Sequence, residues 1–442
     1  MDFDTDRPGK LMMKMCIPSV ITILIMQIYH MADVFFIGKL NSPAMVSGLS
    51  LASPVIAILS TVGVLVGGGG CAALAMALGR KDDSSAKKIV SFSFWSSIGL
   101  GVIVGAVLIL FLDKMVALFG ASEEASGYCR QYMIVMAIGA PAMCFSQAMG
   151  SLIRGKGKSY QSLTGNMIGS VLNIVLDPLF IFVFRMGVLG AAAATLASNL
   201  VASVFYIAYM LKPTFGISVS IRNYTLKKDI SVTVLSLGLP MAFMTVLNFV
   251  SSIISNRILA SYGDVMVASV SITRKITSFV TMLQMGITSG MQPVLAYTFG
   301  AGDYIKLKDF TKRTAVTTVA IGSILTISCY LAGPVLVRFF MDIPEIISIG
   351  TLSIRIALLA GPFSGLQQLG TSFFQATKRP TTALFLSLTR DGIIYIPFLF
   401  LFNGLWGFTG YLYARPAGTI LSVIITIIML IRLFPQKEKM ES

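Results

Sequence analysis

Long continuous runs of apolar residues, separated by short polar segments, are the dominant pattern along the chain. Runs of about 20 apolar residues or more are long enough for an α-helix to cross the hydrocarbon core of a bilayer. A membrane β-barrel needs short alternating segments instead. The pattern predicts twelve membrane-spanning helices, at 15–38, 46–78, 89–112, 126–153, 161–184, 190–211, 231–259, 265–299, 312–336, 346–375, 381–402 and 406–433. We therefore expect an all-α polytopic membrane protein.

The composition agrees with this expectation. The 442 residues are 55% hydrophobic and only 12% charged, whereas soluble domains carry about 25% charged residues. Most of the 34 Lys and Arg lie in loops on one side, such as 80–88, 154–158 and 306–313. Because loops rich in Lys and Arg stay in the cytoplasm, both termini are expected there. The net charge of +15 is thus explained by topology and anionic membrane lipids, and no nucleic-acid partner is expected.

An internal repeat divides the predicted helices into two sets of six. Pro18 aligns with Pro240, and Gly69–Asp82 aligns with Gly290–Asp303 at a constant offset. Each half starts on the same side of the membrane, so the duplication is parallel. Two six-helix lobes related by an axis along the membrane normal are typical of alternating-access transporters. The predicted divisions are an N-terminal lobe at 1–211, a cytoplasmic linker at 212–230 and a C-terminal lobe at 231–442.

Three carboxylates interrupt the apolar runs. Of the 19 Asp and Glu, only Asp33, Asp177 and Asp391 fall inside a predicted helix. A charged side chain deep in a bilayer costs on the order of 3 kcal/mol, so such a residue is first interpreted as functional.

The surroundings of Asp33 suggest cation chemistry. Tyr29 and His30 precede Asp33 by four and three residues, so all three can share one helix face. An apolar environment favours the neutral carboxyl group, which allows Asp33 to load and release a proton. The same carboxylate could instead coordinate Na⁺. His30, the single histidine, is either a packing residue or a proton relay.

A second polar patch is predicted on the fifth helix. Asn173 and Asp177 lie at i and i+4 and therefore stack on one face. Thr195 would add a hydroxyl group if the fifth and sixth helices pack together. A proton needs a single carboxyl group, whereas Na⁺ needs several converging oxygens, so these three residues and Asp33 form a metal site only if Na⁺ is the coupling ion.

Charged residues in the second half form another candidate group. Arg390 and Asp391 are adjacent, so their side chains should point roughly 100° apart on a helix and need separate partners or an indirect pairing. We expect a charge network with Arg415 of the last helix. Together with Arg274 and His30, these residues are candidates for a relay or for the wall of a substrate cavity.

These features together resemble the MATE (multidrug and toxic compound extrusion) transporters, in the branch that contains DinF-like and MepA-like pumps. The resemblance covers essentially the whole chain. It rests on Tyr29-xxx-Asp33-xxxx-Gly38, Asn173-xxx-Asp177-Pro178, Thr195, Gln292-Pro293 with the turn Gly300–Asp303, and Arg390 with Pro397.

The resemblance implies a secondary active transporter and not an enzyme. In such a transporter, H⁺ or Na⁺ moves inward while a small cationic amphipathic compound is extruded by alternating access. It also implies a monomer in the bacterial inner membrane, with no cofactor apart from the coupling ion. The positions that would form the N-lobe cation site are Asp33, Asn173, Asp177, Thr195 and Tyr29.

The chain also departs from the family pattern. Neither 231–259 nor 346–375 holds an Asp or Glu, which argues against a C-lobe cation site. Arg415 stands where related pumps usually carry a neutral residue. The alternative function is therefore a flippase or exporter of an anionic or lipid-linked amphipathic metabolite. The segment 150–157 nearly fits a phosphate-binding loop, but it lacks the Ser or Thr after Lys, so no nucleotide is expected.

Overall fold

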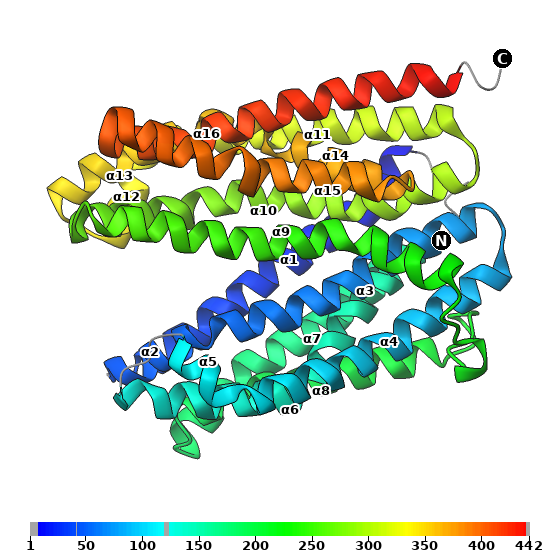
Figure 1. The fold of residues 1–442 in the computed structure, drawn as a ribbon, viewed down its shortest axis with the longest axis horizontal. Coiled ribbons are helices and arrows are strands. Elements are labelled where there is room, and N and C mark those ends of the chain that lie inside the picture. Colours follow the sequence, from blue (N-terminus) through cyan, green and yellow to red (C-terminus); the bar gives the residue numbers. More distant parts are fainter. Residues whose placement is uncertain (1–7, 41, 119–122, 439–442) are drawn as a thin grey trace. The chain divides into compact units, whose positions relative to one another are not determined.

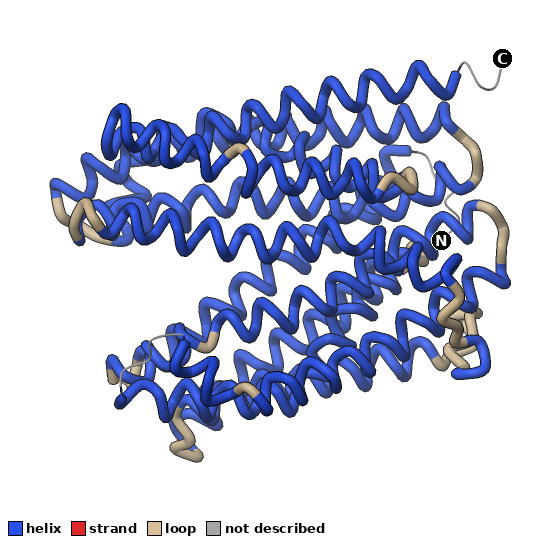
Figure 2. Tube along the Cα trace, viewed as in Figure 1, coloured by secondary structure: helices blue, strands red, loops and turns tan. Residues whose placement is uncertain are grey.

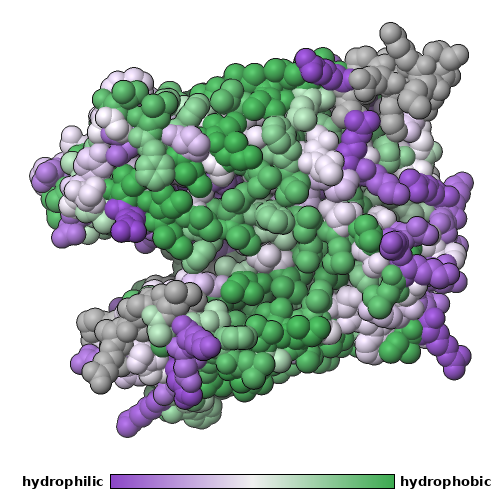
Figure 3. Space-filling view, in the orientation of Figure 1, coloured by the Kyte–Doolittle hydropathy of each residue, from purple (hydrophilic) through white to green (hydrophobic). Residues whose placement is uncertain are grey.

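The computed structural model describes residues 8–40, 42–118 and 123–438, and within them every regular element is a helix (Figures 1 and 2). The all-α fold predicted from the apolar runs is confirmed. Hydrophobic side chains gather along the middle of the helices, and hydrophilic ones gather at their ends (Figure 3). This distribution is the one expected of a protein whose helices cross a bilayer.

The described residues of the first half form eight α-helices and one π-helical turn. Their bounds follow the predicted runs closely, except that the run 46–78 is divided near Ala52 and that the seven-residue α5 was not predicted. The elements are α1 (Pro8–Gly38), α2 (Pro43–Leu51), α3 (Ser53–Gly79), α4 (Asp83–Leu110), α5 (Leu112–Leu118), α6 (Glu123–Gly155), α7 (Ser159–Pro178), η1 (Leu179–Val183) and α8 (Val188–Met210).

The second half begins after the short 3₁₀ turn η2 (Ile221–Asn223). The short α12 was not predicted, because one or two turns are too short to show a period. The elements are α9 (Lys228–Ala260), α10 (Asp264–Gly300), α11 (Tyr304–Leu331), α12 (Gly333–Phe340), α13 (Pro344–Ala357), η3 (Leu358–Phe363), α14 (Ser364–Ala376), α15 (Pro380–Leu388), η4 (Thr389–Ile393) and α16 (Tyr395–Glu438).

Within the described residues, ten helical segments are long and apolar enough to cross a membrane. The last of them, Pro380–Arg432, combines the two final predicted helices. Gly407, the second residue of the predicted helix 406–433, breaks this segment with φ 58° and ψ −135°. The predicted helix 265–299 is present as the 37-residue α10, which is not among the ten.

The duplication is visible in the turns that precede α4 and α11. Asp82 accepts a hydrogen bond from the Ser85 backbone N–H over 2.9 Å and thereby caps α4. Asp303 accepts from the Lys306 backbone N–H over 2.9 Å and caps α11. Each aspartate thus accepts from one of the backbone N–H groups that a helix start otherwise leaves unpaired. The aligned aspartates are therefore the N-terminal caps of corresponding helices in the two halves.

Left-handed backbone positions repeat in the same way. Three pairs have positive φ: Lys81 with Gly302 and Gly157 with Lys378, both at the offset that relates Gly69 to Gly290, and Gly187 with Gly407, one residue short of that offset. In two of these pairs one half uses glycine and the other uses lysine. A residue with a side chain is strained at positive φ. Since this conformation recurs even where lysine replaces glycine, the geometry of the turn imposes it and not the residue type.

Contacts divide the chain into two compact units. Unit 1 comprises Ile21–Ala242, and unit 2 comprises residues 8–20 with 243–438. In unit 1, α3 packs closely against α6 along a buried stripe of small residues. A Cβ added at Gly67 would lie 2.6 Å from the Ala148 Cα, so glycine is needed for this approach. The close packing fixes the scaffold on which the polar residues of unit 1 are held.

Candidate functional site

Four of the predicted cation-site residues are buried in unit 1. Asp33 lies on α1, Asn173 and Asp177 lie on α7, and Thr195 lies on α8. Their exposed fractions are 6% for Asp33, 1% for Asn173, 0% for Asp177 and 1% for Thr195. Polar side chains at this depth require partners, because removing them from water is costly.

The packing of α7 on α8 brings Asn173 and Thr195 together. The Asn173 Nδ2 donates to the Thr195 Oγ1 over 3.3 Å. On α8, the Asn199 Nδ2 donates to the Thr195 backbone oxygen over 2.8 Å. The Asn199 Oδ1 in turn accepts from the Ser146 hydroxyl over 2.8 Å. A continuous polar path therefore runs from Asn173 through α8 to α6.

Four buried oxygens in this region have no hydrogen-bond donor among the described residues. They are the Asp33 Oδ1, the Asn173 Oδ1 and both carboxylate oxygens of Asp177. The charges of Asp33 and Asp177 also interact with each other. Leaving a buried acceptor unpaired costs about 1–3 kcal/mol, and more when it is charged. This group of oxygens therefore lacks compensating positive charge. Bound protons, or a Na⁺ ion coordinated by these hard oxygen ligands, would supply it.

Two tyrosines surround the carboxylates. Tyr29 on α1 is close enough to interact with the charges of Asp33 and Asp177. Tyr132 on α6 is 1% exposed, and it interacts with both carboxylates and with Thr195. Tyr132 was not predicted from the sequence, because a tyrosine within an apolar run does not differ from an ordinary core aromatic. The predicted His30 lies on α1, but its side chain is outside the described residues.

A cavity of about 80 Å³ in unit 1 begins beside Tyr29. No Asp, Glu, Lys or Arg is among the residues that line it in the described part of the chain. Its walls are made of hydroxyl, amide and apolar groups. The polar lining residues are Tyr29, Ser60, Ser146, Gln147, Asn166, Ser170, Ser198, Asn199 and Tyr206. The cavity therefore offers a neutral, hydrogen-bonding space next to the buried carboxylates.

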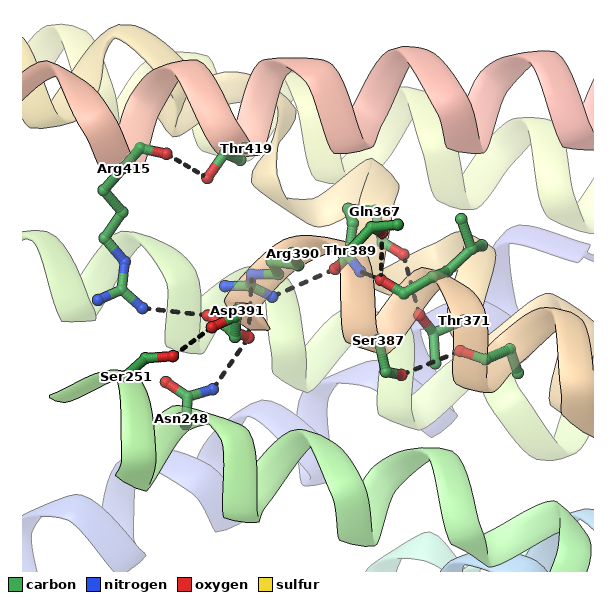
Figure 4. Close-up of polar contacts among 12 residues, drawn as sticks. Asn248, Ser251, Gln367, Thr371, Ser387, Thr389, Arg390, Asp391, Arg415 and Thr419 are labelled. Carbon is green, nitrogen blue, oxygen red and sulfur yellow. Dashed lines mark hydrogen bonds and ion pairs between the residues drawn. The ribbon is translucent and has the colours of Figure 1, made fainter. Parts of the chain in front are cut away.

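The second polar cluster is centred on Asp391 in unit 2 (Figure 4). Asp391 is 2% exposed and lies in the π-helical turn η4. Its Oδ1 accepts from the Arg415 Nη2 over 3.3 Å, and its Oδ2 accepts from the Asn248 Nδ2 over 3.1 Å. The Ser251 hydroxyl donates to the Asp391 backbone oxygen. The network predicted between Asp391 and Arg415 is present.

Arg390 belongs to this cluster, whereas Arg274 belongs to a separate network of unit 2. The Arg390 Nε lies 3.8 Å from the Asp391 Oδ2, so the adjacent residues share a contact that regular helical spacing did not predict. The Arg390 Nη1 also donates to the Gln367 Oε1 over 3.3 Å. Arg274 on α10 reaches α9 and α16 instead, through bonds to neutral side chains. All four residues predicted in this half therefore belong to hydrogen-bond networks of unit 2.

The sequence is similar over most of its length to those of known multidrug export proteins. The model of the MatE family matches two segments, residues 18–179 and 240–401. Multidrug export protein MepA of Staphylococcus saprophyticus is 32% identical over 412 residues, which are 93% of this chain and 91% of the relative. The protein of the same name from Staphylococcus aureus strain MSSA476 is also 32% identical over 93% of this chain and 91% of its own.

Solved structures share the fold at lower identity. A MOP superfamily transporter from Pyrococcus furiosus superposes with a TM-score of 0.91 at 22% identity, covering 97% of this chain and 96% of the other. An outward-facing multidrug resistance MATE family transporter also has a TM-score of 0.91 at 22% identity, with coverage of 98% and 97%.

The two matched segments are equal in length, and they begin at Pro18 and Pro240, the prolines that the internal repeat aligned. The duplicated two-lobe fold is thus supported by sequence, structure and family. The chain belongs to the MatE family of multidrug export transporters, and it is a multi-pass membrane transporter and not an enzyme.

Proposed function

We propose that this transporter exports small cationic amphipathic compounds and couples their export to inward movement of H⁺ or Na⁺. Asp33 and Asp177 carry the coupling cation, while Asn173, Thr195 and Tyr29 orient them. Transport proceeds by alternating access. No other cofactor takes part.

One observation supports this proposal most directly. The Asp33, Asn173 and Asp177 side chains contribute four buried oxygens without a donor among the described residues. Two interacting carboxylates in such surroundings are stabilised only when positive charge is added. A site with this deficit binds a cation tightly in one conformation and releases it when the helices move and water enters.

Coupling follows from competition. Loading the carboxylates with H⁺ or Na⁺ neutralises them, and this removes the attraction that a cationic substrate experiences in unit 1. A ligand shifts a conformational equilibrium only by its differential affinity for the two states. The charge change at Asp33 and Asp177 supplies that difference for both the ion and the substrate.

The substrate class is inferred from the cavity of unit 1 and from the relatives. The relatives are named multidrug export proteins. Among the described residues, the cavity wall has no basic side chain and combines Tyr29 and Tyr206 with apolar side chains such as Met26 and Met143. Aromatic faces attract organic cations, and methionine adapts to apolar bodies of different shape.

The excess of Lys and Arg in the loops on one side supports an orientation with both termini in the cytoplasm of a bacterial inner membrane. We propose that the transporter acts there as a monomer.

The test is ethidium efflux from proteoliposomes under an imposed inward pH gradient or an imposed inward Na⁺ gradient. We expect one gradient to drive efflux by the wild type and not by Asp33→Asn. Asp309→Asn is the matched control, since the Asp309 side chain is partly exposed and pairs with Arg313. Efflux by Asp33→Asn at the wild-type rate would refute the coupling role, and absence of gradient-driven efflux by the wild type would refute cation export.

A further inference from the structure

Unit 2 contains its own cavity, of about 130 Å³, which differs in charge from the cavity of unit 1. Three arginines line it, and among the described residues no Asp or Glu does. Hydroxyl groups cover much of the remaining polar wall. The arginines are Arg274, Arg390 and Arg415, and the hydroxyl groups include those of Tyr395 and Tyr411.

The positive charge of this cavity is only partly compensated. In the described part of the chain, Asp391 is the single carboxylate in the network, and it is shared between Arg390 and Arg415. Arg274 has neutral acceptors: the Asn256 Oδ1 at 2.5 Å from its Nη1, and the Ser255 Oγ and Tyr411 OH, each 2.7 Å from its Nη2. The described residues of the cavity wall and of these networks thus carry three guanidinium groups and one carboxylate.

Shared contacts also link two of the arginines, Arg274 and Arg415. The guanidinium carbon of Arg415 lies 5.2 Å from the centre of the Tyr395 ring. The Tyr395 hydroxyl donates to the Ser255 Oγ over 3.1 Å, and the same oxygen accepts from Arg274. One aromatic ring and one serine therefore connect Arg274 to Arg415. In Figure 4, Arg415 extends from α16 toward Asp391, and Arg390 lies next to Asp391.

We infer that this cavity is an anion-binding site that takes the carboxylate or phosphate group of an amphipathic molecule. Guanidinium groups bind planar and tetrahedral oxyanions with paired hydrogen bonds. The apolar lining residues Val270, Leu358 and Leu412 would contact the hydrophobic part of the ligand. The inference concerns binding at unit 2 and goes beyond the export proposed for unit 1.

The internal carboxylate gives the site a distinctive property. Asp391 forms ion pairs with Arg390 and Arg415, as a bound anion would. Asp391 therefore competes with the ligand for these two guanidinium groups. Removing a basic residue and removing Asp391 should therefore change anion affinity in opposite directions. A purely structural role for these residues predicts loss of stability in both cases and no gain of affinity in either.

The test is isothermal titration of 1-naphthoate, an amphipathic carboxylate, into the full-length protein in dodecyl maltoside. We expect Arg274→Gln to weaken binding about 10-fold, as loss of one charge-assisted contact implies, and Asp391→Asn to strengthen it severalfold. Arg338→Gln is the matched control, because Arg338 is an exposed residue of unit 2 that pairs with Asp342. Thermal unfolding and size exclusion verify that each variant is folded, and Arg274→Lys replaces Arg274→Gln if the latter is not.

A second measurement separates the two sources of the anion. If the phosphate group of phosphatidylglycerol occupies the site, the naphthoate affinity should be lower in phosphatidylglycerol nanodiscs than in phosphatidylcholine nanodiscs. Native mass spectrometry would then detect phosphatidylglycerol retained by the wild type and lost from Arg274→Gln. Equal naphthoate affinity in both lipids assigns the site to small organic anions. The inference is overturned if Arg274→Gln binds like the wild type, if Arg338→Gln loses as much affinity, or if the wild type retains neither ligand.

Discussion

Asn173 donates its side-chain amide to the Thr195 hydroxyl over 3.3 Å, and this bond joins α7 to α8 beside the buried Asp177. The bond uses the nitrogen of the amide and leaves the Asn173 Oδ1 without a donor among the described residues. Thr195 therefore determines which atom of Asn173 is available to a cation.

Replacing Thr195 with valine should weaken cation coupling. Valine has nearly the same shape but accepts no hydrogen bond, so the Asn173 amide can rotate and present its nitrogen to the site. We expect gradient-driven ethidium efflux to fall several-fold while the protein remains folded. Thr164→Val is the control, because Thr164 is exposed on the same α7 and bonds only its own helix backbone at Tyr160. An equal loss in both variants would contradict the role of Thr195.

Removing both carboxylates should stabilise the protein while abolishing coupling. Buried charges without hydrogen-bond partners are destabilising, and their neutral isosteres often raise stability. At pH 8 without Na⁺, the Asp33→Asn, Asp177→Asn double variant should melt at a higher temperature than the wild type.

Acid or Na⁺, whichever is the coupling ion, should raise the melting temperature of the wild type, since a ligand stabilises the state that binds it. The double variant should not respond. If its melting temperature rises as much as that of the wild type, the cation is bound elsewhere.

The N-terminal cap of α4 should make a measurable, pH-dependent contribution to stability. Hydrogen bonds from the Ser85 side chain and backbone lower the pKa of Asp82 below its usual value. The stabilisation is therefore fully present above the unfolded-state pKa of about 4, and it is lost as the pH falls through the lower pKa of the folded state.

Asp82→Ala should cost about 1 kcal/mol at neutral pH. Asp83→Ala is the control, since Asp83 lies within the first turn of α4 and is not its cap. The measurement is thermal unfolding of both variants between pH 3 and pH 7. A difference between Asp82→Ala and the wild type that stays constant over this range would contradict the assignment.

Lys81 should be replaceable by glycine with a gain in stability. Its φ is 58°, whereas the aligned position in the second half is Gly302 with φ 75°. Glycine adopts this conformation without strain, so Lys81→Gly should add about 0.5–1 kcal/mol to the free energy of unfolding. Lys87→Gly, inside α4, should instead lower it by about 1 kcal/mol. The same sign for both changes would show that backbone strain is not the cause.

The fold was largely predictable because its signals are local. Apolar runs define the long helices, and the spacing of Asn173 and Asp177 places them on one face before any tertiary contact is known. The juxtaposition of Thr195 with Asn173 required the packing of α7 on α8, which the sequence allowed but did not establish.

Other features depend on contacts that no local pattern encodes. Tyr132 resembles any core aromatic until α6 places it beside Asp33. The three neutral partners of Arg274 come from α9 and α16, and Tyr411 lies 137 residues further along the chain. The π-helical turn Thr389–Ile393 alters the angle between Arg390 and Asp391 that regular helical spacing predicts.

We propose that the coupling cation occupies the buried oxygens of Asp33, Asn173 and Asp177 and competes with the exported compound. The most direct test of this competition is to add ethidium to the purified transporter in weakly buffered detergent solution and measure the H⁺ or Na⁺ released. Competition predicts release of about one cation for each ethidium bound by the wild type, and none by the Asp33→Asn, Asp177→Asn double variant. Ethidium binding without cation release by the wild type, or equal release by the double variant, would contradict it.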